Sequence, residues 1–379
     1  MNRDEPGAAR RTLESLWRRE LSLGGLIAWI GLVPLSMLYL GAVAVHALFW
    51  KAFASGSKSL RIVSVGNLTV GGNGKTPFTL YLARRLRERG ARVAIVSRGY
   101  GGSSTRAAIV SDGKSIALSA EQAGDEPVMM ARSFGGPVAI GRRRAAALSL
   151  LERIEGLQVV ILDDGFQHRR LKRDVDLIVV STEGGLGNGW ALPAGPLRER
   201  LSGIRRADAV ILLSSGPDCD PHWVASQFAR LARRPLFCGR LVPTALIAPH
   251  PEGWQELPLS LAHRRVLVVS GLADPSRLYG MLRDLGAELV GVLEYPDHHP
   301  YSASDWHRIT TAARDAELIV TTEKDLTKLE RFPFARDCLY ALRLKVVIDG
   351  DEEKLLALAA GKAYDQATQQ TPVKVALEV

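Results

Sequence analysis

The chain carries two kinds of hydrophobic pattern, one after the other. From Leu21 to Trp50 there is no Lys, Arg, Asp or Glu, and this run is long enough to cross a bilayer. After Lys58, short apolar runs alternate with stretches of helical periodicity. The short runs predict strands at 61–65, 93–97, 158–162, 176–181 and 209–214, and the longer stretches predict helices at 75–89, 126–133 and 141–154.

A second series of the same kind follows closer to the C-terminus. Strand and helix alternate there as 265–270, 275–285, 288–293, 302–315 and 317–321. Alternation at this spacing predicts an α/β fold with a mainly parallel sheet and helices on both faces. The region 235–258 is punctuated by Pro and Gly and separates the two series. We therefore predict an N-terminal segment 1–50, a first α/β/α domain 51–235, and a smaller second α/β/α domain 236–379.

The apolar N-terminal run is open to four interpretations. It is longer than the apolar core of a signal peptide. A single membrane span is compatible with its length, but basic residues flank both of its ends, so orientation is not defined. A helix that bends near Pro34 and enters one leaflet keeps both the preceding arginines and the following domain on one side. A buried pair of core helices is the remaining alternative. We predict a membrane-associating helix, monotopic or spanning.

Composition narrows the class of partner without choosing it. The 379 residues are 46% hydrophobic and 23% charged, as in a globular protein, and the formal net charge is +9. This balance favours anionic partners, which include nucleic acid, acidic lipids and phosphorylated ligands. The widely separated Cys219, Cys238 and Cys338 form no CxxC pair, which indicates a reducing compartment.

The segment LTVGGNGKTP has the character of a nucleotide phosphate loop. It lies between a predicted strand and a predicted helix, and its glycines allow backbone amides to approach phosphate. Lys75 is predicted to reach the β- and γ-phosphates, and the Thr76 hydroxyl to bind Mg²⁺. The usual GxxxxGK[ST] pattern has glycine where this chain has Thr69, so a glycine-rich turn before a helix is the alternative. The predicted ATP-binding residues are Thr69, Val70, Gly71, Gly72, Asn73, Gly74, Lys75 and Thr76.

A phosphate-loop enzyme also needs a carboxylate at a nearby strand end to organise Mg²⁺. Asp163 and Asp164 follow the apolar run 158–162, and Gln167 and His168 come soon after them. An Asp pair at a strand end is often only a turn, but together with Lys75 and Thr76 it predicts a metal site. No [NT]KxD segment is present, which argues against guanine specificity.

Seven motifs in order resemble one known family. They are NLTVGGNGKTP, SRGYGG, GDEP, LDDGFQHRRL, LPAGPLRE, PDHHPY and TTEKD, between Asn67 and Asp325. The sequence resembles the tetraacyldisaccharide 4'-kinases of lipid A biosynthesis in Gram-negative bacteria. The resemblance implies two α/β domains joined by a short hinge, with the active site in the cleft between them. It also implies ATP as co-substrate, Mg²⁺, and attachment to the cytoplasmic face of the inner membrane.

The resemblance assigns roles to individual residues. Asp125 of GDEP matches the family's proposed base, and His298 of PDHHPY matches the histidine that activates it, although His299 is adjacent. A carboxylate can accept the proton of a sugar hydroxyl as the phosphoryl group arrives. Without the family, Asp125 fits a helix N-cap and the histidine pair fits a surface loop. The other residues matched to the metal or the cleft are Asp164, Asp163, Glu199, Arg198, Gln167 and His168, and His299 is also placed at the cleft. Lys324, at the end of the last predicted strand, is expected to contact nucleotide or help close the cleft, with a structural salt bridge as an equal alternative.

Two functions from different classes remain to be compared. The first is a lipid kinase that phosphorylates the 4'-hydroxyl of a membrane-embedded tetraacylated glucosamine disaccharide 1-phosphate. The second is a membrane-associated regulatory NTPase that binds a protein partner. The acid and histidine motifs favour the kinase, whose partners are ATP, membrane lipids and the lipid acceptor. Neither nucleic acid nor an obligatory protein partner is expected.

Overall fold

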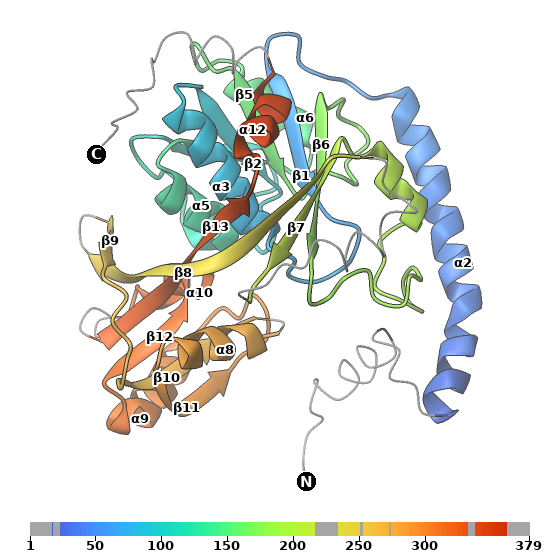
Figure 1. Ribbon diagram of the computed structural model, residues 1–379. Coiled ribbons are helices and arrows are strands. Elements are labelled where there is room, and N and C mark those ends of the chain that lie inside the picture. Colours follow the sequence, from blue (N-terminus) through green and yellow to red (C-terminus); the bar gives the residue numbers. More distant parts are fainter. Residues whose placement is uncertain are drawn as a thin grey trace.

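The computed structural model describes residue 17 and residues 23–216, 234–250, 253–272, 274–332 and 338–361. The arginines of the first 20 residues, Cys219 and the tail from Lys362 onward lie outside these ranges. The described chain forms a long N-terminal helix beside a twisted sheet that carries helices on both faces (Figure 1). The α/β fold with a mainly parallel sheet and one apolar N-terminal helix is thereby confirmed.

The first half of the molecule, residues 61–216, follows the predicted alternation closely. The strands predicted at 93–97 and 209–214 have those same bounds in the structure. Most of the remaining strands of this half have a glycine or a charged residue at or next to one end. Its elements are β1 (Arg61–Gly66), α3 (Lys75–Glu88), β2 (Val93–Ser97), β3 (Ala108–Asp112), α4 (Ala120–Ala123), α5 (Asp125–Phe134), β4 (Pro137–Ile140), α6 (Arg144–Leu151), β5 (Val159–Asp163), β6 (Val175–Ser181), the 3₁₀ helix η1 (Leu201–Arg206) and β7 (Ala209–Ser214).

The second half, residues 253–349, repeats the arrangement on a smaller scale. Its predicted series is present, with the strand at 265–270 again reproduced to the residue. Its elements are β9 (Gly253–Leu257), β10 (Arg265–Ser270), α8 (Ser276–Asp284), β11 (Glu288–Glu294), α9 (Ala303–Ala312), η2 (Ala313–Asp315), β12 (Leu318–Thr322), α10 (Glu323–Leu329) and β13 (Leu339–Asp349). The strand β8 (Leu236–His250) precedes this half, and the helix α12 (Glu352–Ala360) follows it.

A single sheet runs through both halves. Its strand order is β11-β10-β12-β13-β8-β7-β6-β1-β5-β2-β4-β3, and β9 pairs with β8. The long strand β8 pairs with β7 in parallel at its start and with β13 in antiparallel fashion over most of its length. The connection expected to be a short hinge therefore consists of two long paired strands (Figure 1). The domain boundary at 235/236 stays a prediction, and α12 returns to pack against α3 and β1 of the first half.

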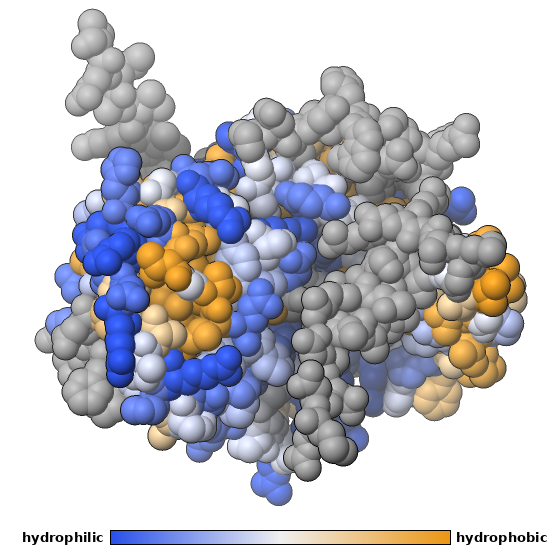
Figure 2. All heavy atoms as spheres, turned by 90° about the horizontal axis from the view of Figure 1, so that it is seen from below, coloured by the Kyte–Doolittle hydropathy of each residue, from blue (hydrophilic) through white to orange (hydrophobic). Residues whose placement is uncertain are grey.

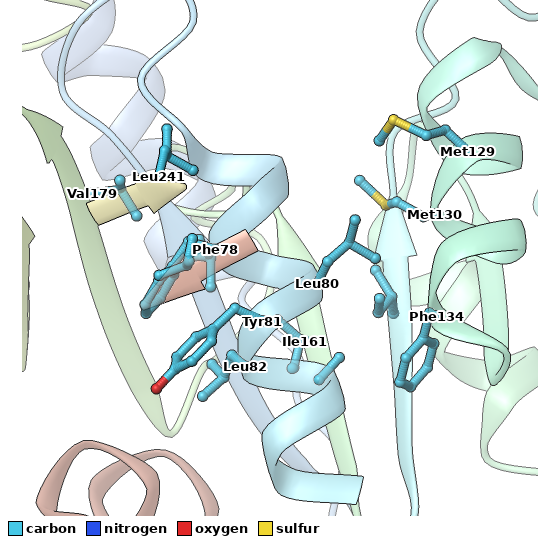
Figure 3. Packing of buried hydrophobic residues seen from close by; sticks show 14 of the residues in the cluster. Phe78, Leu80, Tyr81, Leu82, Met129, Met130, Phe134, Ile161, Val179 and Leu241 are labelled. Atoms are coloured by element: carbon cyan, nitrogen blue, oxygen red, sulfur yellow. The ribbon is translucent and has the colours of Figure 1, made fainter. Parts of the chain in front are cut away.

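Apolar side chains on the two sheet faces belong to different clusters. On one face, α3 and α5 pack over β1, β2 and β5. Figure 3 shows Leu80 projecting from α3 toward Met130 and Phe134 of α5. On the opposite face, α6 covers Ile62 and Leu162. Since the carboxyl ends of the parallel strands meet at one edge of the sheet, the loops after β1, β2 and β5 are brought together there.

The N-terminal apolar run forms one helix, α2 (Leu23–Ala52), which continues through Pro34. The helical stretch 25–50 is long and apolar enough to cross a membrane. Of the 18-residue window used to judge its hydropathy, 6% is buried inside the protein. One side of α2 contacts the loop 190–198, because Ser36 Oγ donates to Ala191 O at 2.7 Å and Trp29 Nε1 to Ala194 O at 2.9 Å. Its other side exposes Leu38 and Leu48, and Figure 2 shows this apolar surface at the right edge, where Figure 1 places α2.

Candidate functional site

The loop 67–74 between β1 and α3 is held in shape by its own side chains. The Asn73 amide donates to the Thr69 hydroxyl at 2.6 Å, and the Asn67 amide donates to Thr69 O at 2.7 Å. Gly74 has φ 75°, and a Cβ there would lie 3.0 Å from Leu213 Cδ1, so glycine is required. A Cβ at Gly71 would meet nothing within 4 Å, and the same is true of Gly72. This part of the loop is open to a ligand, as a phosphate cradle must be.

Lys75 and Thr76 begin α3 directly after this loop. The Lys75 ammonium donates to Asn67 Oδ1 at 2.9 Å and lies 3.1 Å from Asp164 Oδ1. The helix N-terminus adds a positive dipole end to this charge. The structure therefore brings the predicted phosphate-binding lysine and the predicted acidic pair together.

The two neighbouring aspartates at the end of β5 have opposite electrostatic environments. Burial, together with Glu126 and Asp164, raises the pKa of Asp163 to about 7. Burial also opposes ionisation of Asp164, but Lys75 and Arg198 outweigh it and lower the pKa of Asp164 to about 2. Arg198 Nη1 lies 2.9 Å and 3.0 Å from the two Asp164 oxygens. Asp164 is thus a carboxylate at neutral pH that already faces cations.

Asp125 lies at the start of α5 and contacts two cationic side chains of the second half. His298 Nδ1 is 3.0 Å from Asp125 Oδ1 and 3.1 Å from Oδ2, and Lys328 Nζ is 3.0 Å from Oδ2. Burial opposes ionisation of Asp125, yet His298, Lys324 and Lys328 together hold its pKa well below the usual range. The N-cap of α5 is Gly124 rather than Asp125, so the alternative that Asp125 is the helix N-cap is wrong.

The two adjacent histidines point to different partners. The bond to Asp125 raises the pKa of His298 against the opposing effect of burial. His299 Nε2 instead lies 3.0 Å from Asp305 Oδ2, and its ring stacks on Tyr295. His299 therefore supports the N-terminus of α9, and only His298 contacts Asp125.

Lys324 belongs to the charged network that joins the two halves. Its ammonium lies 2.6 Å from Asp297 Oδ1, 3.3 Å from His298 Nε2 and 3.8 Å from Glu126 Oε1. Glu126 is on α5 in the first half, whereas Lys324 is on α10 in the second. Lys324 therefore bridges the two halves and forms the salt bridge that was its alternative interpretation.

Glu199 and Gln167 belong to a second polar cluster, in which Glu199 is buried and Gln167 is half-buried. Glu199 is 3% exposed and is paired with Arg169 at 2.8 Å and Arg206 at 3.0 Å. The Gln167 amide donates to Asn67 O at 2.8 Å and to Glu199 Oε1 at 3.3 Å. In this arrangement two guanidinium groups occupy the oxygens of Glu199, so its predicted role as a metal ligand requires an arginine to move.

His168 is also at this edge of the sheet. Burial and the nearby cations, led by Arg144 and Arg173, lower its pKa to about 4. His168 is therefore a neutral imidazole at physiological pH, able to donate or accept a hydrogen bond but not to contribute charge.

Residues around Asp125 that motif analysis did not identify are Lys328, Asp297 and Glu126. Lys328 follows Lys324 by four residues on α10, a helix that the sequence analysis did not predict, and this spacing puts both lysines on the same face. Asp297 is within PDHHPY, and Glu126 is within GDEP, beside residues that were selected.

The donor set suits Mg²⁺. Within the described ranges, no three His, Cys, Asp or Glu side chains converge on a common point. Mg²⁺, however, usually takes one or two carboxylates together with phosphate oxygens and water. Asp163, Asp164 and the Thr76 hydroxyl provide oxygen donors. Burial, together with the Glu126 and Asp164 carboxylates, raises the pKa of Asp163, and a nearby cation would favour its ionised form.

Comparisons with known proteins agree with one another. A family model described as "Tetraacyldisaccharide-1-P 4'-kinase" matches residues 28–361. The tetraacyldisaccharide 4'-kinase of Syntrophus aciditrophicus is 44% identical, over 71% of this chain and 75% of that protein. The enzyme of the same name from Pelobacter propionicus is 38% identical over 89% and 93%. A crystal structure of LpxK from Aquifex aeolicus in complex with ATP is 34% identical with a TM-score of 0.71, and covers 87% of this chain and 98% of that one.

Proposed function

The chain belongs to the tetraacyldisaccharide-1-phosphate 4'-kinase family, and we propose that its cleft carries out this reaction with Asp125 as the base. The protein is a kinase that transfers the γ-phosphate of ATP to the 4'-hydroxyl of a tetraacylated glucosamine disaccharide 1-phosphate. The observation that carries the assignment of residues is the contact of Asp125 with His298, 3.0 Å apart, across the two halves.

The residues of the first half bind the nucleotide. The open loop 67–74 receives the β- and γ-phosphates through its backbone amides, and Lys75 balances their charge as it increases in the transition state. In the structure Lys75 pairs with the Asp164 carboxylate. When ATP binds, a phosphate oxygen replaces Asp164 as the partner of Lys75. Arg198 remains on Asp164 and keeps it oriented.

The transfer itself is a displacement at phosphorus. The acceptor 4'-oxygen forms a bond to the γ-phosphorus, the bond to the bridging β–γ oxygen breaks, and ADP leaves with that electron pair. The hydroxyl proton passes to the Asp125 carboxylate. His298 donates its Nδ1 hydrogen to Asp125 and thereby orients it. Because the two residues come from different halves, this alignment exists only while the halves are in contact.

Asp163, Asp164 and Thr76 would hold Mg²⁺. When bound, the ion neutralises charge on the transferred phosphoryl group and aligns the phosphates. Asp163, whose pKa is raised by burial and by neighbouring carboxylates, would be in its ionised form in this role. Thr79 donates to Asp163 Oδ1 at 3.0 Å and fixes the direction of that carboxylate.

We place the protein on the cytoplasmic face of the inner membrane through α2. The side of α2 that carries Trp29, Ser36 and Tyr39 donates hydrogen bonds to the loop 190–198, so a spanning helix would draw that polar loop into hydrocarbon. A helix lying in the interface keeps these bonds and buries its exposed apolar side. This supports the monotopic form over the spanning form.

The regulatory NTPase is disfavoured, because a nucleotide switch has no need of a carboxylate base held between the halves. The test uses ATP labelled at the γ-phosphate and the acylated disaccharide 1-phosphate in detergent micelles. We expect labelled lipid, and no label with a matched 4'-deoxy acceptor. Release of free phosphate at a rate that ignores the acceptor, without labelled lipid, would overturn the kinase proposal.

A further inference from the structure

Lys328 on α10 is a buried lysine whose charge is directed at the proposed base. The residue is 9% exposed, and its ammonium lies 3.0 Å from Asp125 Oδ2. Its next carboxylate is Asp325 Oδ1, at 3.8 Å, and the Tyr301 ring centroid is 5.4 Å away. Burying an ammonium is unfavourable unless it is paired, and Asp125 is the nearest partner of Lys328 in this position.

The contacts of Asp125 define a separate role for this lysine. Glu126 N–H donates to Oδ1 at 2.9 Å. His298 Nδ1 is nearly equidistant from both oxygens, at 3.0 and 3.1 Å, and so it does not distinguish one from the other. Among the contacts of Asp125 in the described ranges, Lys328 is the one made to Oδ2 alone. The Glu126 N–H thus holds Oδ1, and Lys328 is the contact that holds Oδ2 in place.

We propose that Lys328 is a positioning residue for Asp125, which holds the Oδ2 oxygen of the carboxylate in the orientation needed for proton transfer. The inference rests on the proposed function, since it requires Asp125 to be the base. Lys328 touches neither substrate in this role and acts only through Asp125.

All the charged groups around Asp125 influence its pKa, and through it the pH dependence of the rate. On its own helix is Glu126, and from the other half come the loop before α9 and the helix α10, which together contribute Asp297, His298, Lys324, Asp325 and Lys328. Burial raises the pKa of Asp125, and the surrounding cations lower it by more. Removal of one cation therefore raises the pKa of Asp125. Because the base must be ionised, the acidic limb of the pH–rate profile then moves to higher pH.

A purely structural salt bridge predicts something different. Lys328 joins α10 to α5 across the two halves, so its loss would lower stability in either case. A structural role changes the melting temperature and leaves the pH at which kcat/KM falls unchanged. The pH profile therefore separates the two roles.

The experiment compares Lys328→Met, Lys328→Gln and Lys328→Arg in the full-length protein, with labelled ATP and the acylated disaccharide in micelles. Lys328→Met removes both the charge and the donor, Lys328→Gln keeps a donor, and Lys328→Arg keeps both. Lys345→Met is the matched control, because Lys345 is 45% exposed and pairs with Glu256 away from the cleft. KM for ATP and the melting temperature are measured for each.

For Lys328→Met we expect kcat to fall about ten- to a hundredfold, with an acidic limb at higher pH and KM for ATP within about twofold. Lys328→Arg should restore the limb, and Lys345→Met should match the parent. If Lys328→Met does not fold, Lys328→Gln carries the same test, because it too lacks the charge. An unshifted acidic limb in the folded variants, or one that Lys328→Arg fails to restore, overturns the proposal.

A double mutant separates this proposal from the assignment of the base. In an Asp125→Asn background, Lys328→Met should change kcat by less than about threefold, because residues that act as a unit are non-additive. A further loss as large as in the parent overturns the claim that Lys328 acts through Asp125. Near-normal activity of Asp125→Asn itself would instead reject the base, and with it the premise of this proposal.

Discussion

Replacement of Asp125 by Asn tests the centre of the mechanism, because it keeps the shape of the side chain and removes its ability to accept the proton. Loss of a general base typically costs 10²–10⁴-fold, which corresponds to about 3–5 kcal/mol of transition-state stabilisation. The proposed nucleotide contacts lie at Lys75 and the loop 67–74, away from Asp125, so we expect kcat to fall by this factor and KM for ATP to change little.

The structure also predicts a cost in stability, which must be separated from the kinetic effect. The Asp125→Asn substitution would leave the buried ammonium of Lys328 and the ring of His298 without their nearest negative partner. Breaking a buried ion pair by removing one partner typically costs about 3–5 kcal/mol of unfolding free energy. The assay is therefore run well below the measured melting temperature. Asp112→Asn is the matched control, since Asp112 is the exposed last residue of β3 and its carboxylate contacts only the turn that follows among the bonds described.

A double-mutant cycle with His298→Ala shows whether the two residues act together. If His298 works through Asp125, the double variant loses far less activity than the product of the two single losses. Fully multiplicative losses would detach His298 from Asp125 and leave Asp125 in place. Near-normal kcat in Asp125→Asn, with the control also normal, would refute the base assignment.

Three further predictions concern other parts of the site. Lys75→Ala should abolish labelled-lipid formation, and a loss below about tenfold, or ~1.4 kcal/mol, would contradict the phosphate-loop role. Leu38→Glu with Leu48→Glu should release the protein from membranes at high salt, whereas the control pair on β11, Val290→Glu with Val292→Glu, should not. The pKa of His298 is raised from 6.5, so its stabilisation is complete below that pH and is lost as the pH rises through the raised value. The difference in melting temperature between the parent and His298→Ala should therefore shrink with increasing pH.

Much of the fold was predictable, because its strands are short, apolar and bounded by turns. The strands at 93–97, 209–214 and 265–270 were located to the residue for this reason. The strand β8 was missed because Pro243 and Pro249 lie inside it. Pro243 is tolerated next to a shift in the register with β13, where the regular ladder is already interrupted. A local pattern does not reveal such a compensating irregularity in the partner strand.

The candidate site was predictable where chemistry is concentrated in consecutive residues, as in the phosphate loop and the Asp163–Asp164 pair. Which partner each residue takes was not predictable, because it depends on contacts between distant segments. His298 and His299 are adjacent and chemically identical, yet only the backbone turn at His298, with φ 61°, directs the first ring to Asp125. Lys328 was missed because its partner, Asp125, is 203 residues away in sequence.

The loop 190–198 connects the proposed membrane helix with the phosphate-binding loop. Tyr39 of α2 donates to Arg198 O at 2.8 Å, while Arg198 N–H donates to Leu68 O at 2.7 Å and its guanidinium holds Asp164. Val70 N–H likewise donates to Pro196 O at 2.8 Å. A reaction between a water-soluble nucleotide and an acceptor with acyl chains in the bilayer requires a set distance from the membrane to the phosphates. Because one short loop contacts both α2 and the phosphate loop, the depth of the helix in the membrane would determine that distance directly.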